Sequence, residues 1–552
     1  MKSFYVQILT VFLFLIGSVI QLWGQLSQGG IPLETDASLK ATIPILDIVP
    51  VPLEELLMVP DDHEAGKLKY LYFARNFNVQ VNPKNHGYWI SHRNGYKIWL
   101  VGIRSKGAYS IGLIFSKYRL EGNARLFIYN ENRSKVLGAY TSFNNKTSGI
   151  LPVSHVPGEC IYIQLEVPWE QTEYGELVIG EVTHAYKPLY SDKLSRDGRY
   201  GLSDACNIDI NCNEGAAWQD IKRSVCRIVT NGNKYCTGTL VNTTDEYQEP
   251  YILTAAHCIG SQGEADKSVF VFNYESEICD GPDGSTNHTI SGSLLIATGD
   301  TLGDKLNLDS LDFSLVKLSI SPPDSFRVYL AGWSRKSSPP LQTATIHHPH
   351  GDVKKISFDW DPPETSYHTS DYYYEYVRYS HWRILQWDLA TTEMGSSGAP
   401  LFDQDHRIVG LLTGGEANCD SSVNDYFTKL DYAWNYYNSP LKHLKTWLDP
   451  LNTGTTVLDG LDLTNRTEIY NQNQVSIYPN PGTGKYLIRI NNSYSDDLMI
   501  NVYSIAGEMI FSDKLSYTGL YELNLANYSP GLYIVRLIFP DGIHTNKIIH
   551  QP

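Results

Sequence analysis

The sequence predicts an all-β protein built from several folded units, and three observations support this. At 552 residues the chain is too long for one hydrophobic core, and at about 100 to 200 residues per domain it predicts three or four units. Short segments of alternating apolar and polar residues recur along it, separated by Gly, Asn and Pro. Aromatic residues make up 12% and charged residues 19%, a balance typical of a folded, strand-rich extracellular protein.

Residues 1–24 are predicted to be a signal peptide. Lys2 precedes an apolar run over 6–22, and Gly24 offers a small residue at a plausible cleavage point. The run also approaches the length of a membrane anchor. Export is the favoured interpretation because no other stretch of the sequence is long and apolar enough to span a membrane.

Charge and cysteine content narrow the function classes. The net charge of -16 argues against nucleic acid as a partner, and it would either steer cationic peptides or simply serve solubility. Export would place the eight cysteines in an oxidising compartment, where disulfides persist. Because no Cys-x-x-Cys pair occurs, no zinc or other metal site is predicted, and no cofactor is expected.

Residues 25–200 are predicted to form a β-sandwich, since strand-like alternation recurs between about 65 and 187. This block ends in a polar stretch, 191–200, whose basic residues look exposed and cleavable. These residues are Lys193, Arg196 and Arg199.

Residues 201–463 contain many short strands between long polar loops, as expected of a β-barrel domain. A polar linker is predicted over 464–474. Residues 475–552 then show three hairpin-like runs with Pro/Gly turns, which predict a separate, Ig-like β-sandwich.

Three segments of the middle block carry candidate catalytic residues in the order His, Asp, Ser. YILTAAHCIG at 251–260 delivers His257 at the end of a strand, and LDSLDFSLVKL at 308–318 sets Asp312 at the start of another, where a buried carboxylate needs a partner. In EMGSSGAPLFD at 393–403, two glycines allow a tight backbone that aims N–H groups at one point beside Ser397. Each motif alone has an ordinary structural explanation, but together they predict a base, an orienting acid and a nucleophile.

These motifs resemble the trypsin-like serine peptidases, and in more detail their bacterial lysyl endopeptidase branch. The similarity covers essentially the whole middle block. The further motifs that carry it are GLSDACNIDINC at 201–212, RSVCRI at 223–228, YCTGTLVN at 235–242, AGW at 331–333, IHHPHG at 346–351, and WLDP and LDGLD within 447–462. The resemblance implies a two-barrel chymotrypsin-like fold with the active site between the barrels.

The resemblance also implies three disulfides, Cys206–Cys419, Cys212–Cys279 and Cys236–Cys258. Cys160 and Cys226 have no counterpart in it. A bridge between them would tether the N-terminal block after cleavage, so free or buried thiols are predicted instead.

The implied mechanism assigns proton transfer to His257, orientation of that imidazole to Asp312, and attack to Ser397. The backbone N–H groups of Gly395 and Ser397 would bind the oxyanion.

Trypsin carries Asp immediately before its nucleophile, whereas Ser396 occupies that position here. The salt-bridge switch of trypsin activation is therefore absent, and removal of a covering domain is expected, with the mature chain starting at Gly201. Residues 25–200 would then be a propeptide that assists folding and inhibits; the alternative is a retained binding module.

Specificity in this branch depends on an acid at the base of the primary pocket, after the last paired cysteine. NCDSSVNDYFTKL at 418–430 offers Asp420 and Asp425, of which Asp425 is the better match, although it could be a solvated loop acid. Cleavage after lysine is therefore predicted, with Thr413, Gly414 and Gly415 pairing with the substrate backbone. Thr413 replaces a His of the lysyl branch and the pocket Trp is not placed, which leaves cleavage after arginine, or a broader preference, open.

The C-terminal block resembles the sorting domain of the type 9 secretion system of Bacteroidota, through YPNPGTGKYLIRI, VYSIAGEMI and GLYIVRL. A generic adhesion or carbohydrate module is the alternative. The sequence thus predicts a monomeric serine endopeptidase, secreted or held at the cell surface after export across the outer membrane. Its predicted partners are protein or peptide substrates and the secretion machinery. The competing hypothesis is a surface protein that binds without cutting.

Overall fold

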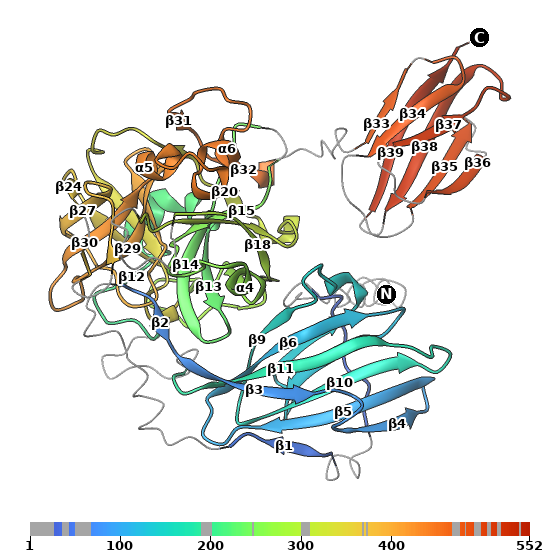
Figure 1. Ribbon diagram of the computed structural model, residues 1–552, viewed down its shortest axis with the longest axis horizontal. Coiled ribbons are helices and arrows are strands. Elements are labelled where there is room, and N and C mark those ends of the chain that lie inside the picture. The colour runs from blue at the N-terminus through green and yellow to red at the C-terminus, as the bar shows by residue number, and fades with distance from the viewer. Residues whose placement is uncertain are drawn as a thin grey trace, which may run out of the picture. The chain divides into compact units, whose positions relative to one another are not determined.

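The computed structural model describes residues 27–35, 43–49, 68–188, 201–245, 248–299, 310–366, 369–370, 374–465, 475–480, 482–490, 498–504, 509–515, 520–539 and 542–551 (Figure 1). It divides into two compact units, Met1–Thr464 and Asn465–Pro552. The predicted signal peptide, the basic stretch 191–200 and most of the predicted linker lie outside the described residues.

The first unit begins with a sandwich of two antiparallel-rich sheets, here called the N-terminal sandwich. Large apolar side chains from both sheets, including Trp99, Phe115 and Ile128, are fully buried between them. One sheet contains β1 (Ile45–Asp47), β4 (Tyr88–His92), β5 (Tyr96–Arg104), β7 (Arg125–Asn130), β8 (Val136–Tyr140) and β10 (Cys160–Pro168); the other contains β3 (Ala74–Val81), β6 (Ser110–Leu120), β9 (Leu151–Pro157) and β11 (Gly175–Ala185).

Residues 201–463, the two-barrel region, follow. The first barrel is a sheet in the order β17-β16-β13-β14-β15-β19-β18, whose two outer strands are consecutive in the chain and separated only by Gly292. Since Gly292 turns there with φ +73, the sheet curls round on itself. Its strands are β13 (Val225–Thr230), β14 (Lys234–Leu240), β15 (Tyr251–Thr254), β16 (Val269–Phe272), β17 (Thr289–Ser291), β18 (Ser293–Thr298) and β19 (Ser314–Leu318), with β2 (Leu71–Tyr72) added to β14.

The second barrel is a sheet in the order β12-β23-β22-β28-β29-β30-β27-β24. An antiparallel bridge between Phe358 and Leu389 joins β23 to the segment that follows β27, which closes this sheet as well. Its strands are β12 (Ile208–Asp209), β22 (Thr343–His347), β23 (Lys355–Asp359), β24 (Glu364–Ser366), β27 (His381–Gln386), β28 (Pro400–Asp403), β29 (Ile408–Gly415) and β30 (Val423–Lys429), with β21 (Trp333–Ser334) and β31 (Val457–Leu458) attached. The prediction of an all-β, two-barrel fold is confirmed.

Shorter elements complete the unit. Two further strand pairs are β20 (Tyr329–Leu330) with β32 (Leu461–Asp462), and β25 (Thr369–Ser370) with β26 (Tyr374–Glu375). The helices are α4 (Gln262–Asp266), α5 (Leu430–Asn435) and α6 (Lys445–Leu448), and the 3-10 turns are η1 (Ser142–Asn144), η2 (Asn213–Trp218), η3 (Ile221–Ser224), η4 (Asp324–Phe326), η5 (Pro349–Gly351), η6 (Pro440–Lys442) and η7 (Leu463–Asn465).

The second unit is a small sandwich of its own, with a core that includes Ile488, Ile500 and Val535. One sheet contains β33 (Val475–Tyr478), β34 (Lys485–Ile490) and β37 (Leu520–Asn524), and the other β35 (Leu498–Ser504), β36 (Met509–Leu515), β38 (Gly531–Phe539) and β39 (Gly542–His550).

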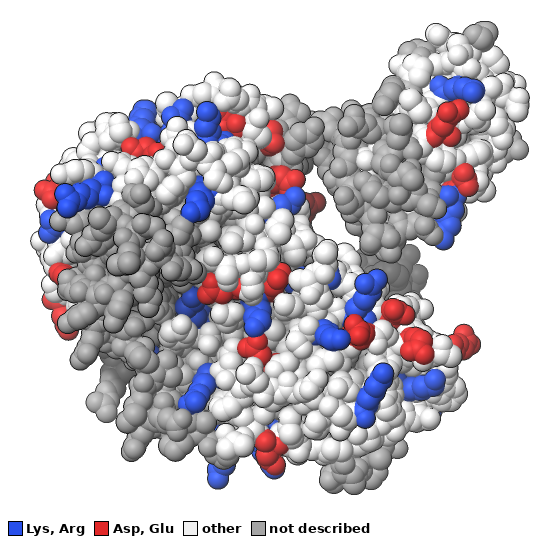
Figure 2. All heavy atoms as spheres, viewed as in Figure 1, with Lys and Arg blue, Asp and Glu red and all other residues white. Residues whose placement is uncertain are grey.

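Charged side chains of both signs are interspersed among the described residues on the face drawn in Figure 2. The described residues on that face form no long basic stripe of the kind that follows a phosphate backbone.

Candidate active site

His257 and Asp312 meet because of strand pairing in the first barrel. Antiparallel β15 and β19 place Thr254 opposite Ser314, so the turn that follows β15 and carries His257 lies beside the segment that leads into β19 and carries Asp312. His257 Nδ1 lies 2.8 Å from Asp312 Oδ2, and the backbone N–H of His257 donates to Oδ1 at 3.1 Å. Burial raises the pKa of Asp312, but the charge and hydrogen bonds of His257 outweigh it and hold that pKa below its ordinary value. Asp312 therefore stays a carboxylate that fixes the imidazole.

Thr413 lies behind this pair. Its buried hydroxyl hydrogen-bonds with Asp312 and lies 3.0 Å from Thr428 Oγ1 and 3.2 Å from His381 Nε2. The side chain of Thr413 therefore supports Asp312, while the backbone of its strand, β29, continues to Gly414 and Gly415, where Gly414 bridges Leu68.

The Ser397 loop has the tight backbone that its glycines predict. Gly395 and Gly398 have φ of +98 and +81, and a Cβ on Gly395 would lie 2.8 Å from the carbonyl oxygen of His348. The N–H groups of Gly395 and Ser397 converge on a single acceptor, the carbonyl oxygen of Lys69, at 2.5 and 3.0 Å. Two donors aimed at one carbonyl oxygen are the geometry of an oxyanion hole.

The neighbouring Ser396 is a buried hydrogen-bonding residue. Its hydroxyl lies 2.7 Å from His347 Nδ1 and accepts the backbone N–H of Glu393 at 3.2 Å. These contacts hold the loop at the position where trypsin uses an aspartate.

The peptide group between Lys69 and Tyr70 lies between the two candidate reacting groups. The Lys69 carbonyl is held by Ser397 N–H, and the ring of Tyr70 lies 5.5 Å from the ring of His257. Within the described part of the chain, neither His257 Nε2 nor Ser397 Oγ makes a hydrogen bond, although both atoms are buried. Both side chains thus face the same segment with their reacting atoms uncommitted.

Asp425, on β30, forms the base of a buried pocket. Its Oδ1 accepts the Lys69 ammonium at 2.6 Å, and its Oδ2 accepts Trp387 Nε1 at 2.7 Å and the Thr392 hydroxyl at 2.6 Å. The same ammonium donates to the Thr392 hydroxyl at 2.6 Å, to the Thr392 carbonyl at 3.1 Å and to the Ala417 carbonyl at 2.8 Å. Burial lowers the pKa of Lys69, and the Asp425 charge opposes this. The carboxylate of Asp425 is fully buried, and both of its oxygens accept hydrogen bonds.

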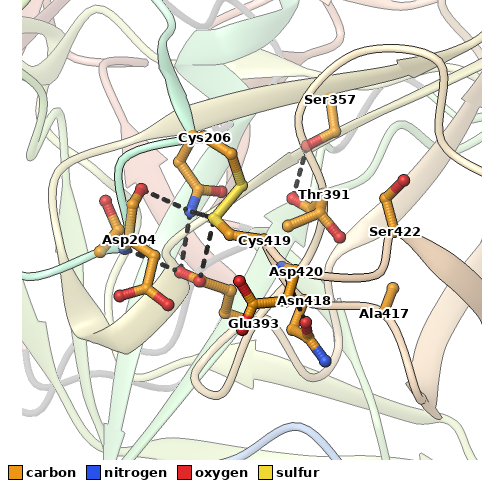
Figure 3. The surroundings of a disulfide bond; sticks show 12 residues. Asp204, Cys206, Ser357, Thr391, Glu393, Ala417, Asn418, Cys419, Asp420 and Ser422 are labelled. Carbon is orange, nitrogen blue, oxygen red and sulfur yellow. Dashed lines mark hydrogen bonds between the residues drawn. A yellow bond between two sulfur atoms is a disulfide. The ribbon is translucent and has the colours of Figure 1, made fainter.

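The Cys206–Cys419 disulfide anchors the loop that carries the Ala417 carbonyl (Figure 3). Glu393 lies against this bridge and accepts Asn207 Nδ2 at 2.8 Å. Asp420, the other acid considered for specificity, is exposed on the same loop. Cys212–Cys279 and Cys236–Cys258 are also bridged, as the resemblance implies, whereas Cys160 and the buried Cys226 are free thiols.

Three groups of potential metal ligands occur among the described residues. Two of them include bridged cysteines, whose sulfurs are not available as thiolates. The third, Asp359, Asp361 and Asp388, consists of carboxylates of which two are exposed, and burial raises the pKa of Asp359 to about 6. None of them is assigned a metal.

Reasoning from the sequence missed three residues of this pocket, namely Lys69, Trp387 and Thr392. Trp387 lies ten positions before Ser397 and belongs to none of the motifs. The one signal that could have pointed to it is its position at the end of a strand. Lys69 lies in another domain, so no spacing within residues 201–463 points to it.

Comparisons with known proteins point to the families that the sequence motifs resemble. Residues 200–428 match the family described as lysyl endopeptidase, C-terminal domain, and residues 476–551 match the secretion system C-terminal sorting domain. A lysyl endopeptidase of Pseudomonas aeruginosa is 29% identical over 295 residues, which are 50% of this chain and 59% of the relative. The chain thus spans about three-fifths of the length of that curated relative.

Two solved structures were also found to be similar. The thermostable serine protease AL20 from an extremophilic microorganism has 13% identity and a TM-score of 0.28, covering 38% of this chain and 91% of that protein. A Glu endopeptidase in complex with MPD has 13% identity and a TM-score of 0.25, covering 42% and 90%.

Residues 200–428 are therefore similar to serine peptidases of the lysyl endopeptidase family. In the same chain, residues 476–551 match the C-terminal sorting domain of a secretion system, identified as type 9. Such a sorting domain implies export across the outer membrane. Among the described residues, no helix has the length and apolar character needed to cross a membrane.

Proposed function

We propose that residues 201–463 form a serine endopeptidase that cleaves peptide bonds after lysine through an acyl-enzyme. Ser397 is the nucleophile, His257 transfers the proton, Asp312 orients His257, and the N–H groups of Gly395 and Ser397 stabilise the oxyanion. The observation that carries the proposal is the position of Lys69, whose carbonyl lies on those two N–H groups while its ammonium reaches Asp425.

Two features of the pocket favour lysine over arginine. Four acceptors surround one nitrogen, which suits a compact ammonium. Trp387 and Thr392 occupy Asp425 Oδ2, so only Oδ1 is offered to the substrate. A guanidinium usually pairs with both oxygens of a carboxylate and would have to displace these donors. The strand edge at Gly414 supports backbone pairing, since Gly414 bridges Leu68 in antiparallel fashion.

The proposal also assigns a function to the segments on either side of the peptidase domain. Residues 25–200 are a propeptide that covers the active site until it is removed before Gly201, and residues 475–552 are recognised by the secretion machinery. A folded surface is sufficient for the second role, and it needs no catalytic residues.

Labelling with a fluorophosphonate tests the nucleophile. The secreted enzyme, freed of residues 25–200, is expected to label and to hydrolyse lysyl peptide amides, and Ser397→Ala should remove the label and lower turnover by roughly 10⁶-fold. A mature protein that neither labels nor hydrolyses would instead be a binding protein on a peptidase scaffold. Comparing lysyl with arginyl amides tests the pocket, and equal rates would contradict the preference for lysine.

A further inference from the structure

The segment of residues 68–73, here called the docked segment, runs through the candidate active site as an extended strand. Leu68 bridges Gly414 of the second barrel, and β2 pairs with β14 of the first barrel through Leu71–Tyr235 and Tyr72–Lys234 (Figure 1). Adding a strand to an exposed sheet edge is how peptides bind many proteins. The docked segment therefore pairs with one barrel before Lys69 and with the other barrel after it.

The side chains of the docked segment are held on both sides of the Lys69–Tyr70 bond. Before the bond, Lys69 is only 4% exposed and makes four hydrogen bonds in the Asp425 pocket. After it, the Tyr70 ring lies between His257 and the ammonium of Lys234, which is 5.3 Å from the ring centroid. Phe73 stacks on Tyr235 with centroids 3.9 Å apart, and its N–H donates to the Asn233 carbonyl at 3.0 Å.

We propose that the Lys69–Tyr70 bond is a self-cleavage site, which the N-terminal sandwich presents to Ser397 of the same chain. This inference rests on the proposed function and adds a substrate to it: a lysyl bond followed by an aromatic residue. It differs from the processing region predicted around Lys193, Arg196 and Arg199, because the docked segment lies more than a hundred residues earlier in the chain.

The reaction consumes one water molecule and needs no other reactant. Ser397 Oγ bonds to the Lys69 carbonyl carbon and its proton passes to His257. The bond from that carbon to the Tyr70 nitrogen then breaks, and His257 gives the proton to this nitrogen. Water next bonds to the same carbon and gives a proton to His257. The bond from that carbon to Ser397 Oγ then breaks, and His257 returns the proton to Oγ. This restores the Ser397 hydroxyl and leaves Lys69 with a carboxylic acid, which loses its proton to solvent.

Attachment of the sandwich to the first barrel makes this reaction intramolecular. The His155 ring nitrogen Nε2 lies 2.7 Å from the Gly232 carbonyl, Asn76 donates to the Asn231 carbonyl at 2.7 Å, and Lys267 pairs with Glu181 at 2.6 Å. Such contacts keep the bond beside the nucleophile at a high effective concentration. The cleaved ends also stay in place, since β1 pairs with β5 on one side and β2 with β14 on the other. Cleavage after Lys69 would therefore divide the chain in two while Lys69 still occupies the Asp425 pocket.

Mapping of chain ends in the full-length secreted protein tests the proposal. After denaturation, mass spectrometry of the wild type is expected to find a fragment that ends at Lys69 and a new N-terminus at Tyr70. Ser397→Ala should lack both ends. The cleaved fraction at a fixed time should not change over a hundredfold dilution, because the reaction is intramolecular; a fraction that falls with dilution overturns that part of the proposal.

Two lysine variants test whether cleavage depends on Lys69 itself. Lys69→Gln should abolish cleavage at this bond, whereas Lys106→Gln, an exposed lysine of the same sandwich, should leave it unchanged. The comparison of the wild type with Ser397→Ala leaves the docked segment unaltered, so the test does not depend on the folding of Lys69→Gln. If the mature enzyme hydrolyses lysyl amides but no ends appear at Lys69 and Tyr70, the self-cleavage site is wrong and the proposed function stands. If the mature enzyme neither labels nor hydrolyses, both are wrong.

Discussion

The N-terminal sandwich contacts the two barrels in different ways. On the first barrel the contacts are spread over several elements and are mostly single polar bonds, such as Lys135 to Asn287 at 3.0 Å and Ser291 to the Pro152 carbonyl at 2.9 Å. On the second barrel the polar contacts described are concentrated on Lys69, whose carbonyl and ammonium reach the Ser397 loop and Asp425. The first set can hold the sandwich in place, and the second occupies the pocket.

Two properties of the N-terminal sandwich should therefore be separable: how firmly it stays attached to the first barrel, and how it blocks the Asp425 pocket. Changes on the first barrel should alter how firmly the sandwich stays attached without altering which side chain the pocket prefers. Changes around Asp425 should alter the preference of the mature enzyme, after the sandwich has gone. Four predictions test this separation, from the largest expected effect to the smallest.

Asp425→Asn should lower kcat/KM of the mature enzyme for lysyl amides on the order of 100- to 5,000-fold. Removing one partner of a buried ion pair costs about 3 to 5 kcal/mol, because the remaining charge is left buried and unpaired. Asp420→Asn is the matched control, since Asp420 is exposed on the neighbouring loop and should leave the rate unchanged. Steady-state kinetics on lysyl and neutral amides would measure this, and equal losses on both substrates would contradict the assignment of the pocket.

Trp387→Phe should cost roughly tenfold to a hundredfold in kcat/KM for lysyl amides. It removes the indole N–H that donates to Asp425 Oδ2 at 2.7 Å, and a hydrogen bond to a charged group is worth about 1.5 to 3 kcal/mol. Because Trp387 positions Asp425 and does not reach the reacting atoms, the loss should fall mainly on KM. The ratio of arginyl to lysyl rates should rise, because Oδ2 keeps only one of its two donors, the Thr392 hydroxyl. A loss confined to kcat would contradict this role.

Trp387 also marks the limit of what the sequence could predict. His257, Asp312 and Ser397 could be found because each lies in a local motif at the end of a strand, and the all-β class followed from alternation along the chain. Asp425 could be found because it follows a cysteine that the resemblance pairs. Trp387 and Thr392 join Asp425 only through pairing of β27 with β30 and through the course of the Ser397 loop.

Lys69 could not be assigned from the sequence for a different reason. Its segment reads as an ordinary strand entry, and 356 residues separate it from Asp425. Only the packing of one domain on another brings the two together. The predicted domain boundaries, including the start at Gly201, remain predictions.

Acid should loosen the sandwich from the first barrel. Burial lowers the pKa of His155 to about 4, with smaller effects of Gly232 and Arg227, and lowers that of Lys146 to about 7, which Asp266 partly opposes. Since both groups bind protons more weakly when docked, their contribution to docking is complete above their ordinary pKa values of 6.5 and 10.5. It is lost as pH falls toward 4 and 7 respectively.

Between pH 7 and 5.5 the docking equilibrium should therefore weaken on the order of tenfold. Hydrogen exchange of the β9 and β17 amides in full-length Ser397→Ala, corrected for intrinsic rates, measures this opening. His155→Gln should remove most of the pH dependence. Exchange that slows on acidification would contradict the assigned sign.

Lys267→Gln should weaken retention of the sandwich by only a few-fold. The pair that Lys267 forms with Glu181 at 2.6 Å is partly exposed, with 31% and 17% of the two side chains accessible, and such pairs are worth about 0.2 to 1 kcal/mol. Glu181 keeps its hydrogen bond from Asn76 Nδ2 at 2.8 Å, so its carboxylate stays hydrogen-bonded in the variant. The effect should shrink with added salt, because ions screen exposed charges.

Lys317→Gln, which removes a pair with Glu249 inside the first barrel, is the matched control and should leave retention unchanged. Hydrogen exchange at β9 measures both variants. A change in the lysine preference of the mature Lys267→Gln enzyme would show that retention and pocket chemistry are not separate.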